Sequence, residues 1–169
     1  GDARTAFYLA QSHRDAGDDE QAMEWYARRA TMPGWVEETY VAMYEYAKAL
    51  ERTGAPTADI VAAHERASAF RPSRAESLYA LARHYRLAGE WQAGYDAACR
   101  ADEVPFPDDT LFVHGDVYRW SSTDERAICA HYLGRHEETV ELCEQLLRSP
   151  DLPLNQRDRV LGNRNFSIP

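Results

Sequence analysis

The sequence predicts an all-α fold, a right-handed solenoid of four helix pairs followed by a C-terminal capping helix. An alanine stands seven residues before a helix-ending glycine at four places: Ala10 and Gly17, Ala47 and Gly54, Ala82 and Gly89, Ala127 and Gly134. Apolar residues between the breakers recur at helical spacing, and no run alternates with a period of two. Prolines follow each second helix, where they cannot continue it.

Each alanine and glycine has a physical role in a helix hairpin. A small side chain lets two helix backbones approach closely, and glycine adopts the left-handed conformation that ends the first helix. A second amphipathic helix is predicted after each turn, over residues 19–30, 59–70, 91–101 and 137–147.

The glycine spacing predicts where the repeats are interrupted. Successive glycines lie 37, 35 and 45 residues apart, against about 34 in a regular tetratricopeptide array. The long third step predicts an insertion loop over residues 104–115, whose apolar residues pack onto the repeats. The chain is therefore predicted to be one tetratricopeptide-repeat domain, with repeats at about 3–33, 36–72, 74–103 and 116–150 and a cap at 154–166.

Several stretches resemble one group of such repeats. They are Gly34-Trp-Val-Glu-Glu, Arg71-Pro-Ser-Arg-Ala-Glu, Pro105-Phe-Pro-Asp-Asp-Thr-Leu-Phe-Val, Asp116-Val-Tyr-Arg-Trp and Asn163-Arg-Asn-Phe. Together they are similar to the repeat region on the carboxy-terminal side of bacterial family-2 glycosyltransferases. The resemblance implies an accessory module, because the nucleotide-binding catalytic domain of that family is absent from these residues. The sequence opens with Gly1-Asp2 and runs almost at once into a helical pattern, so we expect the native protein to begin earlier, and whether a catalytic domain precedes residue 1 is left open.

Composition excludes several classes of function. The net charge of −9 argues against a nucleic-acid partner, because phosphates require a basic surface. No run approaches the about 20 apolar residues of a membrane span, and no signal-peptide pattern begins the sequence. Three cysteines without a CxxC pair predict buried free thiols in a reduced, cytoplasmic compartment.

No motif predicts catalysis, a cofactor or a metal site. His13-Arg14-Asp15 matches the start of a kinase catalytic loop but lacks every other kinase element. His131 and His136 lie on either side of a helix-breaking glycine, which disfavours a zinc site. Asp108 and Asp109 lack the DxD spacing of a glycosyltransferase metal site and are predicted to form an exposed acidic loop tip. We therefore expect no enzyme activity in this chain.

The Ala/Gly register also predicts the residues of the concave face, which the first helices line. Stations six and three residues before each alanine, and one and four residues after it, supply aromatic rings and a basic excess. The predicted partner-binding residues are Arg4, Phe7, Gln11, Arg14, Tyr44, Lys48, Tyr79, Arg83, Arg86 and His131.

This face predicts a non-catalytic scaffold that binds a protein or peptide. Arginine forks suit carboxylates and aromatic rings give rigid contact area, so an extended, acidic segment is the expected ligand. In the alternative, implied by the resemblance, Tyr44 and Tyr79 stack on sugars and the module positions a glycan or a glycosyltransferase acceptor. The sequence leaves open the partner's identity, the oligomeric state, and whether the concave face or the 104–115 loop is the working surface.

Overall fold

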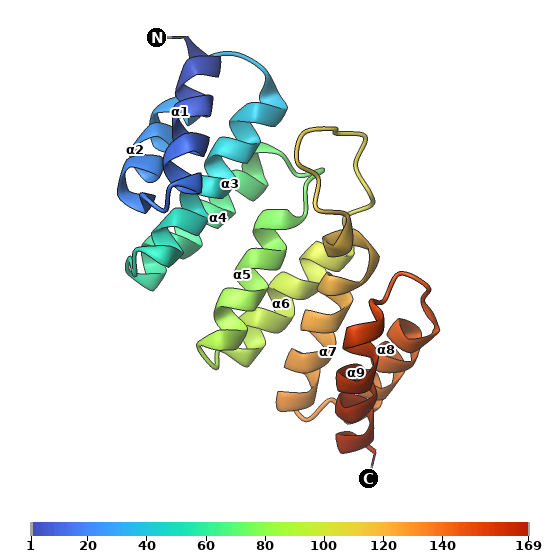
Figure 1. The fold of residues 1–169 in the computed structure, drawn as a ribbon. Helices are drawn as coiled ribbons and strands as arrows, with labels where there is room; N and C mark the ends of the chain where they lie inside the picture. Colours follow the sequence, from blue (N-terminus) through green and yellow to red (C-terminus); the bar gives the residue numbers. More distant parts are fainter. Residues whose placement is uncertain (1, 169) are drawn as a thin grey trace. The chain divides into compact units, whose positions relative to one another are not determined.

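The structure, a computed structural model, describes residues 2–168, which are helical with no β-strand. Its helices are α1 (Ala3–Asp15), α2 (Asp19–Ala30), α3 (Val36–Arg52), α4 (Thr57–Phe70), α5 (Glu76–Leu87), α6 (Trp91–Asp102), α7 (Ser122–Tyr132), α8 (His136–Arg148) and α9 (Leu154–Phe166), with a π-helical turn η1 (Val117–Ser121) before α7. They form four successive hairpins and a last single helix (Figure 1). The predicted all-α class is confirmed.

The chain divides into two compact units. Unit 1 comprises the chain up to Ser77 together with Pro107–Val113, and it contains α1 to α4. Unit 2 comprises Leu78–Phe106 and the chain from His114, and it contains nearly all of α5 together with α6 to α9. Each unit is described below by itself.

All four hairpin turns end the first helix in the same way. The four glycines of the register have φ between +72° and +78°. In the first turn, the amide of Gly17 donates to the Arg14 carbonyl and the amide of Asp18 to the His13 carbonyl. The other three turns repeat this pair of hydrogen bonds, which defines the Schellman motif. The predicted role of these glycines is confirmed.

The alanines of the register lie where the helices of a hairpin meet. All four are buried, with at most 1% of their surface exposed. In unit 2, α6 adds a glycine at the facing position: a Cβ on Gly94 would lie 3.3 Å from the Ala82 carbonyl oxygen and 3.0 Å from the Cys129 sulfur. The backbones of α5 and α6 therefore touch closely.

Unit 1 contains a buried arginine that fixes the turn from α2 to α3. Arg29 is fully buried, and its guanidinium donates to Glu38 at 2.6 Å and to Thr39 at 3.1 Å. It also donates to the carbonyls of Met32 and Trp35. Because a buried charge is costly unless it is paired, this set of acceptors makes the turn a fixed part of the unit.

Unit 2 has an aliphatic core at its C-terminal end. Its buried members come from α7, α8, the loop after α8, and α9: Ala127, Leu142, Cys143, Leu146, Leu152 and Val160. Cys129 is also buried, whereas Cys99 is partly exposed, and all three thiols are free. Packing therefore accounts for two of the three cysteines, as the sequence predicted.

The helix pairing breaks between α6 and α7, where the insertion was predicted. No regular structure occurs from Val104 to His114, and α7 is preceded by the π-helical η1. The Ser122 hydroxyl donates to the Val117 carbonyl, five residues earlier. Short π-helical turns are often found at functional sites, and nothing in the sequence indicated this one.

Candidate functional site

Two of the predicted partner-binding residues are core residues of unit 1. Phe7 is 3% exposed and lies between Tyr26 and Phe112, with ring centroids 6.3 and 6.5 Å away. Tyr44 is 6% exposed and stacks on Tyr40. Contrary to the exposed position expected from the sequence, neighbouring rings cover both side chains in this structure.

The predicted cations of unit 1 gather around one buried carboxylate. Glu45 lies 3.5 Å from the Lys48 ammonium and 3.8 Å from the Arg14 guanidinium, and Arg14 also binds Asp15. Arg4 is exposed and has no ion pair within residues 2–168, while Gln11 is half-buried on α1. The basic excess of this face is therefore smaller than the sequence predicted.

In unit 2 the predicted residues lie on the first helices α5 and α7, which together with the last helix α9 form what we call the first-helix face. Arg86 on α5 binds both carboxylate oxygens of Glu125 on α7, which is 4% exposed. Arg83 is exposed and has no ion pair in the described part of the chain. Tyr79 is half-buried, and burial together with nearby Glu125 raises its pKa.

A hollow of about 310 Å³ opens on this face between α7 and α9. Its lining consists of Ile128, His131, Tyr132, Arg159, Asn163 and Phe166. The His131 ring nitrogen lies 2.8 Å from the Ser167 hydroxyl, and Arg159 binds Asp124 at 2.8 Å. The rings of Tyr132 and Phe166 are 57% and 82% exposed. The hollow thus combines two open rings with a guanidinium, an imidazole and an amide.

The three α9 residues of the hollow were missed, although a signal for them exists. Gly162 occupies the place in α9 that alanine holds in the other first helices. Arg159, Asn163 and Phe166 lie three before, one after and four after it, the stations that Asp124, Ile128 and His131 take around Ala127. Extending the register into the cap, with glycine allowed at the small position, would have found them.

A second hollow lies at the start of α7. It measures about 540 Å³ and is lined by Tyr79 together with the segment from His114 to Ser121, which contains η1. Arg119 lies 5.1 Å from the Phe106 ring centroid, and the indole nitrogen of Trp120 is buried with no hydrogen-bond partner among residues 2–168. The first-helix face of unit 2 is therefore hollowed at both ends of α7.

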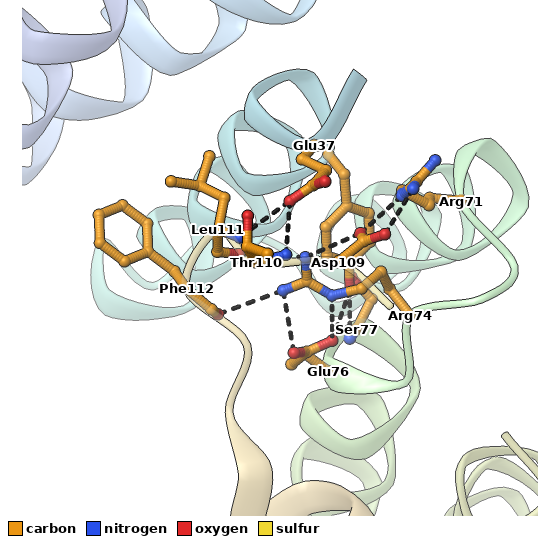
Figure 2. A network of polar contacts seen from close by, with 10 residues as sticks. Glu37, Arg71, Arg74, Glu76, Ser77, Asp109, Thr110, Leu111 and Phe112 are labelled. Atoms are coloured by element: carbon orange, nitrogen blue, oxygen red, sulfur yellow. Dashed lines mark hydrogen bonds and ion pairs between the residues drawn. The ribbon is translucent and has the colours of Figure 1, made fainter. Parts of the chain in front are cut away.

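Unit 1 contains a polar network around Arg74 (Figure 2). Arg74 is 1% exposed and donates twice to Glu76, at 3.0 Å each, while its guanidinium lies 4.7 Å from the Tyr40 ring centroid. The Tyr40 hydroxyl in turn accepts from the Ser77 amide. Burial alone would lower the pKa of Arg74, but Glu76 raises it overall, so the guanidinium stays charged.

This network holds the inserted segment Pro107–Val113, which we call the strap. The Asp109 carboxylate accepts from Arg71, at 2.7 Å for one bond, and from Arg74 at 3.2 Å. Hydrogen bonding from Arg71 holds the pKa of Asp109 below its ordinary value. Figure 2 shows Glu37 accepting from the amides of Thr110 and Leu111, at 2.9 and 2.8 Å.

Arg74 completes the strap's contacts. Its guanidinium donates to the carbonyls of Leu111 and Phe112, each at 3.2 Å. The prediction of an exposed acidic tip is therefore corrected for Asp109, whose carboxylate is 5% exposed, because two arginines bind it; Asp108 is exposed. Glu37, Arg71, Arg74 and Asp109 all lie in stretches that carry the resemblance described above.

No group of three or more His, Cys, Asp or Glu side chains within residues 2–168 is placed to hold a metal ion. In the same residues, no helix is both long enough and apolar enough to span a bilayer.

Solved structures similar to this chain share its fold. One is a kinesin light chain from Podospora anserina with nearly identical TPR-like repeats, at 20% identity and a TM-score of 0.63, covering 97% of this chain and 89% of that one. Another is the MamA protein, at 17% identity and a TM-score of 0.60, covering 98% and 89%. No protein-family model matches the sequence, and no curated protein does.

These similarities confirm the tetratricopeptide-like solenoid class predicted from the sequence. At these identities they establish the fold alone. The association with a glycosyltransferase stays a prediction from the resemblance.

Proposed function

We propose that this chain is a non-catalytic scaffold that binds a protein partner on the first-helix face of unit 2. The hollow between α7 and α9 carries the proposal. It places two widely exposed aromatic rings beside polar groups on helices rather than on loops. Exposed rings next to hydrogen-bonding groups are typical of residues that dominate protein interfaces.

The ligand that fits best is an extended segment that carries carboxylates. Arg83 offers a guanidinium with no ion pair in the described residues, and Asn163 offers an amide that can donate and accept. Arg86 and Arg159 are less available, because Glu125 and Asp124 already bind them. We therefore place recognition on Arg83, His131, Asn163 and Phe166.

A second candidate ligand is a carbohydrate. The face of an exposed ring can stack on a sugar, and Tyr132, with 57% of its surface exposed, stacks on Trp91 at 3.9 Å, which holds its ring in place. The resemblance to glycosyltransferase-associated repeats favours this candidate. The glycosyltransferase setting and a reduced, cytoplasmic compartment belong to the proposal on the strength of the sequence alone.

An array experiment separates the two ligands. The labelled chain is applied to extended peptides with carboxylates, to the same peptides as amides, and to glycans. The proposal expects carboxylate peptides to bind and Arg83→Glu or Phe166→Ala to reduce their binding at least about tenfold. Glycan binding lost in Tyr132→Ala would instead support the second candidate.

Matched controls lie outside the proposed face. Arg66→Glu changes an exposed arginine of α4, and Tyr8→Ala removes a ring of α1 that is 58% exposed. Both variants should bind like the parent chain. The proposal is overturned if Arg83→Glu and Phe166→Ala leave peptide binding unchanged while the control variants reduce it.

A further inference from the structure

The strap makes the contacts of a bound peptide. Its side chains and its backbone are both recognised: Asp109 by two arginines, two successive amides by Glu37, two successive carbonyls by Arg74, and the Phe112 ring by Phe7. Backbone contacts give affinity to an extended segment and side-chain contacts select its sequence. We call Phe7, Glu37, Arg71 and Arg74 the cradle.

Two residues of the cradle, Arg74 and Phe7, are held in place by groups other than the strap. Glu76 and the Tyr40 ring position the Arg74 guanidinium, and both belong to α3 or α5. The Tyr26 ring packs edge-on against Phe7. A site whose groups are fixed in advance binds with little loss of conformational freedom. Arg74 and Phe7 are therefore positioned without the strap, whereas Glu37 and Arg71 contact the strap itself.

The strap itself has few other attachments. Phe112 remains 49% exposed although it stacks on Phe7, and its φ of +47° is the one positive value at a non-glycine residue in the described chain. A phenylalanine in that conformation carries backbone strain. Asp108, next to Asp109, is exposed and forms no polar contact within residues 2–168. The backbone of the strap is thus strained at Phe112, one of the two residues whose side chains contact the cradle.

We propose that the cradle is a second binding site, independent of the face in unit 2, for an extended segment of a partner protein. The segment has a carboxylate followed three residues later by an aromatic ring, with an aliphatic residue between them. In the free chain the strap occupies the site, and a partner's segment binds by displacing it.

The test uses the full chain and a labelled 12-residue peptide, VPFPDDTLFVHG, which copies residues 104–115. Asp109→Asn with Phe112→Ala weakens the strap in the chain. Fluorescence anisotropy should show the peptide binding at least about tenfold more tightly to this variant than to the parent chain. The peptide with its second aspartate changed to asparagine should lose at least about tenfold, and the peptide with its first aspartate changed should bind normally.

The unmodified chain provides a second measurement in case the variant is poorly folded. The amides of Thr110 and Leu111 donate to Glu37, so their hydrogen exchange reports on strap docking. Excess peptide should accelerate exchange at both amides, and the peptide with its second aspartate changed to asparagine should accelerate it less at the same concentration.

The proposal is overturned if a helical, strap-weakened variant shows no saturable peptide binding. It is equally overturned if the two aspartate-substituted peptides bind alike, or if excess peptide leaves the two amides protected. None of these results bears on the unit 2 face, whose residues are unchanged throughout.

Discussion

Unit 1 and unit 2 are built from hairpins of the same type, yet the residues that cover their surfaces differ. In unit 1 the predicted ligand-facing rings are covered, and a segment of the chain occupies the arginine cluster. In unit 2 the buried acids Asp124 and Glu125 bind arginines, and the surface beside them stays hollow. A shared repeat thus fixes the hairpins, whereas the chemistry of each surface depends on which residues occupy the stations and on what packs against them.

The largest expected effect is the loss of Arg74. Arg74→Ala leaves the buried Glu76 without its arginine and removes one of the two arginines that bind Asp109, so the free energy of unfolding should fall by about 3–5 kcal/mol. Denaturant titration followed by circular dichroism measures it. Arg66→Ala on α4 is the matched control and should stay within about 0.5 kcal/mol of the parent chain.

The cysteines show whether that loss is confined to unit 1, because all three lie in unit 2. Burial raises the pKa of Cys129 to about 12 and that of Cys143 to about 11, so both should resist alkylation at neutral pH while unit 2 is folded. If both thiols are alkylated as fast in Arg74→Ala as in the fully unfolded chain, the two units do not unfold independently.

The turn glycines should instead affect both units equally. Gly54→Ala in unit 1 and Gly134→Ala in unit 2 each force an alanine into φ above +70°, with nothing within 4 Å of the new Cβ. Each should cost about 1–2 kcal/mol. Thermal unfolding of the two variants gives the comparison, and costs that differ by more than about 1 kcal/mol would contradict an equivalent role of the turns.

Substituting two helical glycines of unit 2 distinguishes the effect of steric crowding from that of backbone flexibility on stability. Gly94→Ala places a Cβ near Cys129 and two backbone atoms of α5, and it should destabilise by about 1 kcal/mol after the gain in helix propensity. Gly162→Ala meets nothing within 4 Å and should stabilise by about 0.5–1 kcal/mol. If denaturant titration shows that both variants are stabilised, the helices α5 and α6 pack less closely around Gly94 than the structure shows.

The smallest effect is a pH dependence confined to the strap. The folded pKa of Asp109 is lowered by Arg71, so its stabilising contribution is complete above the unfolded pKa and is lost as the pH falls below about 4. Exchange of the Thr110 and Leu111 amides should rise in that range, relative to the other helix-protected amides. In Asp109→Asn the exchange should already be fast at neutral pH and should lose this dependence.

Local features of the fold were predictable from the sequence. A glycine with positive φ and an alanine seven residues earlier act within one hairpin, so the register located all four pairs. The cradle was not predictable, because Asp109 meets Arg71 and Arg74 across 38 and 35 residues of chain. Nothing in the pattern of either stretch specifies that pairing.

The candidate site was predictable only in part, for the same reason. The register placed Ile128 and His131 at inner stations of α7, where the hollow opens. It could not show that Phe112 would cover Phe7, or that Glu45 would gather Arg14 and Lys48, because both depend on tertiary packing.

The distance between the strap and its cradle along the chain has a consequence during synthesis. Arg74 leaves the ribosome 35 residues ahead of Asp109, which at about 5–20 residues per second is a delay of about 2–7 seconds. Hairpins with local contacts form far faster than that. Every newly made copy therefore passes through an interval in which the arginine pair is folded and vacant, open to whatever carboxylate-bearing segment is nearby.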